Sequence, residues 1–402
     1  MIPMRELVSH SIGGGWGEKL RADGTEQVAI IRGADFPAVA VGDTSGVPHR
    51  WESVRKLPQR TLQPGDIVLE GSGGTSDRPT GRTVFISEQL LDRFDVPAIP
   101  ASFCRLVRID PALADPHYVY WWLQGMYADG RTWGYQNRST GIANFQFQHF
   151  LDTETVRLPS LDEQRAIAAT LGALDDKIES NRRAISLIDE LVRARFEANF
   201  DLTQVSDGVS IAELVTVNRR LKLSRGTVST YIGMSSLPEF SPSVLDWEKR
   251  EFGSGQKFMN GDVLMARITP CLENGKTAVV DMLQEGEVGW GSTEYVVLSP
   301  KESISTPWIY ALVRHPDLRE WAVRRMSGTS GRQRFPADSF ADYIISEPGS
   351  AQLDEFNMFA LPLFERIAQL RDEIKKLICV RDALLPEVLS GRIRIPTEGA
   401  EA

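Results

Sequence analysis

A heptad pattern in the middle of the chain constrains the fold more than any other feature of the sequence. Its members recur at alternating steps of four and three: Ile167, Leu171, Leu174, Ile178, Asn181, Ile185, Ile188 and Val192. This seam predicts one long amphipathic helix over residues 158–200, opened by Pro159 and Ser160. About 35 residues rising about 1.5 Å each would make a rod of roughly 50 Å. Such a helix is a spacer or one arm of a coiled coil.

A second seam near the end of the chain predicts its partner. The same alternation runs through Leu363, Ile367, Leu370, Ile374, Leu377, Arg381, Leu384 and Val388. Gly391 follows, where a glycine that ends a helix is expected, so the second helix is placed in residues 347–395. The polar seam residues Asn181 and Arg381 would fix register and partner. We predict that the two helices pack antiparallel; the alternative is two surface helices of ordinary domains.

The two halves of the chain repeat short motifs in the same order. The matched segments are Glu6–Val8 with Glu213–Val215, Ile31–Pro37 with Ile232–Pro238, Pro64–Leu69 with Asn260–Met265, Ser139–Gly141 with Thr329–Gly331, and Leu161–Glu163 with Leu353–Glu355. A period of about 200 residues indicates a duplicated domain rather than a solenoid. We therefore predict a mixed α/β (α+β) fold with a pseudo-twofold repeat. Its globular units would occupy residues 1–157 and 201–346, and residues 396–402 would be a disordered tail.

Composition excludes several classes of protein. The three cysteines, Cys104, Cys271 and Cys379, show neither a disulfide framework nor zinc spacing. No signal-peptide pattern and no apolar run near 18 residues is present, so we expect a soluble, cytoplasmic protein. The net charge of −9 argues against a general polyanion binder but permits local basic patches.

Polar loops at matching places in the two halves are the candidate nucleic-acid contacts. Residues 314–334 hold six arginines, the most basic window of an acidic chain. Arginine suits phosphates and base edges because its planar fork donates two parallel hydrogen bonds, although a solvated helix face would have the same composition. The candidates are Arg78, Arg82, Arg131, Asn137, Arg138, Ser139, Thr140, Asn274, Lys276, Arg324, Arg325, Thr329, Ser330, Arg332, Gln333 and Arg334.

Motifs for catalysis are missing along the whole sequence. The five histidines show no metal-ligand spacing, and no nucleophile elbow, zincin motif or phosphate-loop lysine is visible. Asp115-Pro116-His117-Tyr118 only approaches the tetrapeptide with which amino-methyltransferases hold a flipped base. We therefore expect a chain that positions other molecules and has no catalytic or metal-binding residues of its own.

The long helices carry a resemblance to a known family. Residues 159–183 (PSLDEQRAIAATLGALDDKIESNRR) resemble the central conserved helix of the specificity subunits of type I restriction–modification systems. Residues 384–395 (LLPEVLSGRIRI) resemble the conserved end of that family. The second helix departs from the pattern, since Phe356 stands where the first helix has Gln164.

This resemblance implies a non-catalytic subunit with two target recognition domains, each reading one half of a split, asymmetric site in double-stranded DNA. The helices would set the gap between the half-sites and dock two methyltransferase subunits, which restriction subunits would join. The docking positions that it implies are Glu163, Gln164, Asp175, Lys177, Asn181 and Arg182. S-adenosylmethionine, ATP and magnesium would belong to the partners. Two alternatives remain: the recognition part of a fused methyltransferase–nuclease, and a coiled-coil scaffold without a DNA role.

Overall fold

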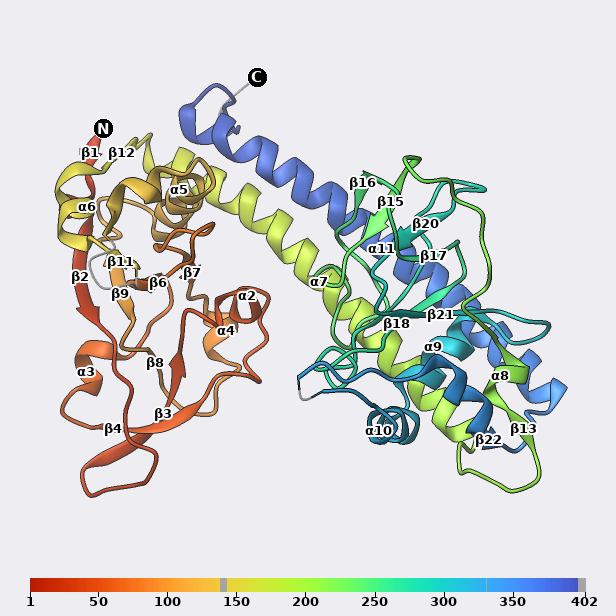
Figure 1. Ribbon diagram of the computed structural model, residues 1–402. Helices are drawn as coiled ribbons and strands as arrows, with labels where there is room; N and C mark the ends of the chain where they lie inside the picture. Colours follow the sequence, from red (N-terminus) through yellow and green to blue (C-terminus); the bar gives the residue numbers. More distant parts are fainter. Residues whose placement is uncertain (138–142, 330, 397–402) are drawn as a thin grey trace. The chain divides into compact units, whose positions relative to one another are not determined.

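The computed structural model describes residues 1–137, 143–329 and 331–396 and divides into two compact units (Figure 1). Unit 1 is Met1–Glu179 with Leu377–Ala402, and unit 2 is Ser180–Lys376. Each unit therefore contains one part of each long helix. The tail predicted to be disordered lies, from residue 397, outside the described residues. Within the described ranges, no helix is both long and apolar enough to cross a membrane.

Both predicted long helices are present: α7 (Leu161–Asn199) and α11 (Ser350–Ser390). Ser160 begins α7, because its hydroxyl accepts a hydrogen bond from Glu163 N–H at 3.3 Å. Gly391 follows α11 with φ +75°, the left-handed conformation that glycine adopts at low cost.

Contacts inside each unit show that the helices run antiparallel, as predicted. In unit 1, Leu171 near the start of α7 shares a core with Val388 near the end of α11. In unit 2, Phe196 near the end of α7 shares a core with Phe356 near the start of α11. The polar seam residue Arg381 forms an ion pair with Asp175 of α7 at 2.6 Å, which ties the register of the helices to a charge pair.

Unit 1 is built from antiparallel sheets with one parallel pair, β3 and β8. The sheets, in spatial order, are β2 (Val8–Gly13), β9 (Cys104–Ile109), β5 (Ile67–Glu70) and β7 (Thr83–Phe85); β4 (His49–Ser53), β3 (Thr25–Ile31) and β8 (Ala98–Pro100); β10 (Gln136–Asn137), β11 (Ala143–Phe145) and β6 (Ser72–Gly73); and β1 (Ile2–Pro3) with β12 (Thr155–Val156). Its shorter helices are α1 (Met4–Leu7), α2 (Phe36–Val39), α3 (Leu57–Arg60), α4 (Glu88–Leu91), α5 (Pro116–Ala128), the 3₁₀ helix η1 (Arg131–Tyr135) and α6 (Phe147–Thr153).

Unit 2 repeats three of these four sheets, with one strand added and without a counterpart of the β10-β11-β6 sheet among its described residues. Its sheets are β14 (Thr216–Val217), β21 (Tyr295–Ser299), β18 (Val263–Ala266) and β19 (Thr277–Val279); β16 (Glu248–Glu251), β15 (Val228–Ile232), β20 (Gly289–Gly291) and the added β17 (Gln256–Phe258); and β13 (Val209–Ser210) with β22 (Ile344–Ile345). Its shorter helices are α8 (Ile211–Leu214), α9 (Thr306–Arg314), α10 (Pro316–Arg324) and η2 (Ala337–Asp342). The parallel pair recurs as β15 with β20, so the duplication read from the sequence extends to the fold.

A repeated Gly-Asp motif starts the central strand of each unit. Gly65 and Gly261 both turn the chain at positive φ (+91° and +90°), which favours glycine. The carboxylates that follow, Asp66 and Asp262, are buried and accept the N–H three residues earlier at 2.7 Å in each case. The motif therefore has a structural role: it closes the turn that precedes β5 and β18.

Candidate nucleic-acid interface

The two units share one main-chain frame at the end of their central strands. In unit 1, Gly71 N–H follows β5 and donates to Phe103 O at 2.8 Å; in unit 2, Arg267 N–H follows β18 and donates to Glu294 O at 3.0 Å. Phe103 and Glu294 therefore occupy equivalent positions. We call residues 70–82 and 101–103 the unit 1 edge, and residues 266–268, 292–294, 327–329 and 331–335 the unit 2 edge.

At the unit 1 edge, two arginines share one buried carboxylate. Arg82 donates to both oxygens of Glu70, at 3.0 Å and 2.6 Å, and also to Gly33 O at 2.6 Å. Arg78 reaches the same carboxylate at 3.2 Å. One carboxylate neutralises only one of the two guanidinium groups, so the pair retains a positive charge. The more exposed Arg78 carries the donors that remain available.

A hollow of about 600 Å³ lies at this edge. Arg32, Arg78, Arg82, Trp16 and Phe103 are among the side chains that line it. Arg32 is paired with Asp35 and Arg82 with Glu70, so the three guanidinium groups keep one uncompensated positive charge. A positive charge beside two large aromatic rings suits nucleic acids, because the cation attracts phosphates and the rings contact bases. The unit 1 edge is therefore our first candidate site.

The unit 2 edge holds an arginine in another way. Arg334 donates Nε–H and Nη2–H to the Glu294 carboxylate, at 2.9 Å and 2.7 Å. The main chains of Arg334 and Ser327 form two hydrogen bonds, one in each direction. Arg332 and Gln333 are exposed beside it. The chain thus anchors arginine at both edges with a glutamate, but Glu70 ends a central strand, whereas Glu294 occupies the position of Phe103.

Other predicted contacts lie elsewhere or are already bonded within the chain. Arg131 pairs with Asp129 and Glu154, away from the unit 1 edge, and Asn137 lies in β10. The remaining pairings are Asn274 with Glu239, Lys276 with Met234 O, Arg324 with Glu320 and Arg325 with Asp342. Thr329 is exposed at the unit 2 edge. Arg138, Ser139, Thr140 and Ser330 fall outside the described residues.

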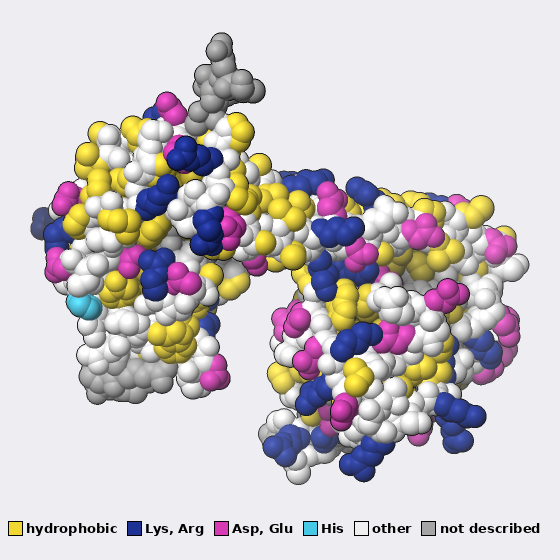
Figure 2. All heavy atoms as spheres, turned by 90° about the horizontal axis from the view of Figure 1, so that it is seen from above, with side chains coloured by type: hydrophobic (Ala, Val, Ile, Leu, Met, Phe, Trp, Pro, Cys, Tyr) yellow, Lys and Arg dark blue, Asp and Glu magenta, His cyan; other side chains and the backbone are white. Residues whose placement is uncertain are grey.

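Sequence reasoning missed Trp16, Arg32 and Phe103. Their types are unremarkable in the sequence, and they come from three separate loops. The repeat itself was the one available signal. Aligning the segment β8–β9 with the segment β20–β21 places the apolar Phe103 opposite the charged Glu294. On the face shown in Figure 2, basic side chains are interspersed with acidic ones, in keeping with the net charge of −9.

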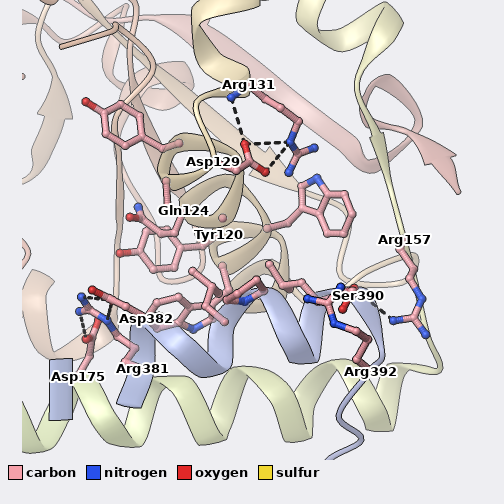
Figure 3. A pocket seen from close by; sticks show the side chains of 18 of the residues that line it. Tyr120, Gln124, Asp129, Arg131, Arg157, Asp175, Arg381, Asp382, Ser390 and Arg392 are labelled. Carbon is pink, nitrogen blue, oxygen red and sulfur yellow. Dashed lines mark hydrogen bonds and ion pairs between the residues drawn. The ribbon is translucent and has the colours of Figure 1, made fainter. Parts of the chain in front are cut away.

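A second hollow, of about 780 Å³, lies in unit 1 between α5 and the parts of α7 and α11 in that unit. Figure 3 shows Asp175, Arg381 and Asp382 together at one end, and Arg157 and Arg392 at the other. Its walls are largely aromatic and leucine side chains. Apolar walls with charged ends suit a protein segment.

The predicted docking residues differ in accessibility. Asp175 lines this hollow, and Glu163 is half-buried on the first turn of α7. Gln164 is buried, and its amide accepts Asp115 N–H and donates to Pro159 O, both at 2.9 Å, so it fixes the start of α7. Of the other three, Lys177 is exposed and Arg182 is half-buried. Asn181 is buried on the seam.

Reactive groups are sparse in the described parts of the chain. No group of three His, Cys, Asp or Glu side chains there could hold a metal ion. Cys104 lies behind Glu70, and burial raises the pKa of its thiol to about 12, so it is protonated at neutral pH. Nothing at either edge indicates bond-breaking chemistry; the groups there are suited to binding.

Known proteins resemble this chain in part of the sequence and in the fold. No protein-family model matches. The type I restriction enzyme EcoEI specificity subunit of Escherichia coli is 26% identical over 162 residues, 39% of this chain and 27% of that protein. The EcoAI specificity subunit of Escherichia coli is 34% identical over 158 residues, 38% of this chain and 27% of that protein. The chain thus matches about a quarter of the length of these curated relatives.

A solved structure extends the likeness to the whole chain. The type I restriction–modification S subunit from M. genitalium has a TM-score of 0.54 and 15% identity, over 96% of this chain and 94% of that one. The two chains therefore share a fold, and the resemblance stated from the long helix is confirmed by the curated relatives.

Proposed function

We propose that this chain is the DNA sequence-specificity subunit of a type I restriction–modification complex and reads a split, asymmetric site in double-stranded DNA. The observation that carries the proposal is the pair of edges. They occupy equivalent places in a duplicated fold, and each presents arginine held by a glutamate. Residues 1–157 and 201–346 would be the two target recognition domains.

The chemistry of the edges suits base reading. An arginine held in place loses less freedom on binding than a free one, and its fork matches O6 and N7 of guanine. At the unit 1 edge Arg78 is best placed for this role, because it bonds Glu70 through Nη1 alone. At the unit 2 edge Arg334 spends its fork on Glu294, so the exposed Arg332 beside it is the better placed arginine. Because the two edges differ in residue type, the two half-sites would differ in sequence.

The remaining parts of the proposed complex are partners. Two methyltransferase subunits would dock on the helix pair, with the hollow of Figure 3 as part of one docking face, and restriction subunits would join them. S-adenosylmethionine, magnesium and ATP would be bound by these partners, and the chain itself would be non-catalytic in the cytoplasm.

The test is the methylation pattern that the chain directs. Cells expressing it with its methyltransferase subunit should carry one split adenine-methylated motif with two different halves. The purified complex should bind a duplex with that motif at least tenfold more tightly than one with either half scrambled. Arg78→Ala should weaken discrimination in one half and Arg332→Ala in the other. Arg5→Ala, which breaks an exposed pair with Asp152 outside the residues of both edges, is the matched control. Binding indifferent to sequence would exclude the proposal.

A further inference from the structure

Two aromatic side chains protrude from rigid backbone at the unit 1 edge. Phe103 is 65% exposed and Trp16 is 44% exposed. The Phe103 carbonyl accepts hydrogen bonds from Gly71 N–H at 2.8 Å and Ser72 N–H at 3.0 Å. Because the backbone is held in this way, the exposure of the ring does not result from a loose loop.

The glycine-rich segment before Trp16 is equally constrained. Gly14 N–H donates to Cys104 O at 3.0 Å, and Gly15 N–H donates to Pro100 O at 2.9 Å. A Cβ at Gly14 would lie 2.1 Å from the Pro100 oxygen, so only glycine lets the strands approach this closely. The segment is hydrogen-bonded along the loop that carries Phe103. Trp16 also packs under the Arg50 guanidinium, 5.1 Å from its ring centroid.

Exposed apolar side chains are common singly, but here two large ones line one hollow beside three arginines. A protein partner would satisfy the rings, whereas the guanidinium groups call for an anion. DNA satisfies both, since a thymine carries an apolar methyl group in the major groove within reach of phosphates and guanine acceptors.

The equivalent position in unit 2 excludes such a contact there. Glu294 replaces Phe103 on the same main-chain frame, and its carboxylate is engaged by Arg334. A carboxylate engaged by an arginine offers no apolar surface to a methyl group. The two edges therefore have opposite chemistry at one structural position.

We propose that unit 1 reads a thymine through its C5-methyl group, by apolar contact with Phe103 flanked by Trp16, next to a guanine bound by Arg78. Unit 2 reads its half-site without an apolar contact at the Glu294 position. This inference rests on the proposed function. Arg78 is assigned the guanine because Arg82 already spends both fork donors within the chain, on Glu70 and Gly33.

The test removes single methyl groups from the DNA. Each thymine of the methylated motif is replaced by deoxyuridine, one at a time, and Kd is measured at fixed salt for the chain with its methyltransferase subunits. Arg78→Ala is also measured on duplexes in which one half of the motif is scrambled. The half whose scrambling weakens the binding of this variant least is the unit 1 half-site. One replacement there should weaken binding roughly fourfold, the effect of one buried methyl group. The effect on Kd of replacements in the other half should be the same whichever residue stands at position 103.

Protein variants separate a base contact from a structural effect. Phe103→Ala should bind the thymine duplex roughly fourfold more weakly and lose its sensitivity to deoxyuridine, so the two changes are not additive. Leu113→Ala removes another exposed apolar side chain of unit 1 and should leave both values unchanged. Unchanged melting temperatures show that the variants fold.

Three results would overturn the inference while leaving the proposed function intact: a unit 1 half-site without thymine, full tolerance of deoxyuridine, or a Phe103→Ala variant that loses methyltransferase binding but keeps its base preference. Absence of sequence-specific binding by both halves would instead reject the proposed function.

Discussion

The helix after the β9 strand in unit 1 and its counterpart in unit 2 begin alike and then differ. Both open with a capping side chain and a proline, Asp115 with Pro116 in α5 and Ser305 with Pro307 in α9. Both place a tyrosine four residues before a polar residue: Tyr120 before Gln124, and Tyr310 before Arg314.

In unit 2 this polar residue is a buried charge. The Arg314 side chain is 4% exposed, donates to the Tyr310 hydroxyl at 2.5 Å and lies 3.9 Å from Asp189 of α7. Arg193 bonds the same carboxylate at 3.1 Å. In unit 1, Gln124 instead donates to Thr83 on β7, and the hollow of Figure 3 remains open beside it.

The difference shows that one position in a duplicated fold can serve either the core or the surface. A buried guanidinium requires a nearby carboxylate, which Asp189 of α7 supplies in unit 2. A glutamine satisfied by a neighbouring strand makes no such demand, so unit 1 keeps a hollow that a partner can enter. The largest expected effects of mutation therefore lie in unit 2.

The strongest test replaces Arg314 with the residue of unit 1. Arg314→Gln leaves the buried Asp189 with fewer partners and should lower the free energy of unfolding by about 4 kcal/mol. Denaturant unfolding of the full chain, with hydrogen exchange to assign the change to unit 2, measures it. Gln124→Ala in unit 1 is the matched control and should cost under about 1 kcal/mol. Similar losses from both would show that the two positions are equivalent after all.

The next largest effect is expected from the two edge glutamates, whose removal should cost different amounts of stability. Glu70→Gln removes a carboxylate that is 3% exposed and faces two guanidinium groups, so it should destabilise unit 1 by about 3 kcal/mol. Glu294, with 22% of its side chain exposed, holds one arginine, and Glu294→Gln should cost about 1 kcal/mol or less. Thermal and denaturant unfolding rank the pair. A larger loss from Glu294→Gln would contradict the burial argument.

Acid should affect unit 2 through Glu287. Burial opposes ionisation of this carboxyl, but hydrogen bonds from Lys249 and Thr230, both 2.7 Å, outweigh it and lower the pKa of Glu287 to about 2. A depressed folded-state pKa gives stability that is complete above the ordinary pKa of 4.5 and is lost as pH falls towards about 2.

The corresponding residue of unit 1, two positions before β8, is Val96, which does not titrate. Glu287→Gln should therefore lower stability by on the order of 2 kcal/mol at pH 7 and by little near pH 2. Unfolding curves at several pH values, with hydrogen exchange resolved by unit, provide the measurement. A loss that stays constant with pH would rule out this linkage.

The smallest expected effect is the reverse exchange in unit 1. Gln124→Arg would place a guanidinium in the hollow of Figure 3, near Asp175 and Asp382, with little change in stability. Under the proposed function it should weaken the docking of one methyltransferase subunit about tenfold, or about 1.4 kcal/mol. Isothermal titration with that subunit resolves this, and Leu113→Ala serves as the exposed control. If the variant binds both methyltransferase subunits as tightly as the unchanged chain does, the hollow is not part of the docking face.

Much of the candidate site could not be predicted from the sequence, because its arginines are held by carboxylates from other segments. Arg78 and Arg334 could be chosen as basic residues in matching loops. Their anchors could not, because Glu70 comes from the end of β5, whereas Glu294 comes from the turn before β21 in the other unit. Arg131 looked equivalent to the others, yet it pairs with Asp129 and Glu154.

The sequence by itself determined the two long helices, their antiparallel pairing and the duplication, because these follow from local periodicity and from motifs such as Gly65-Asp66 that act within a few residues. Only the tertiary structure decided which side chains share a surface. Whether Phe103 is exposed, whether Arg314 is buried and which carboxylate holds an arginine depend on segments far apart in the chain, and the free energy of each arrangement is set by burial and pairing that no local pattern records.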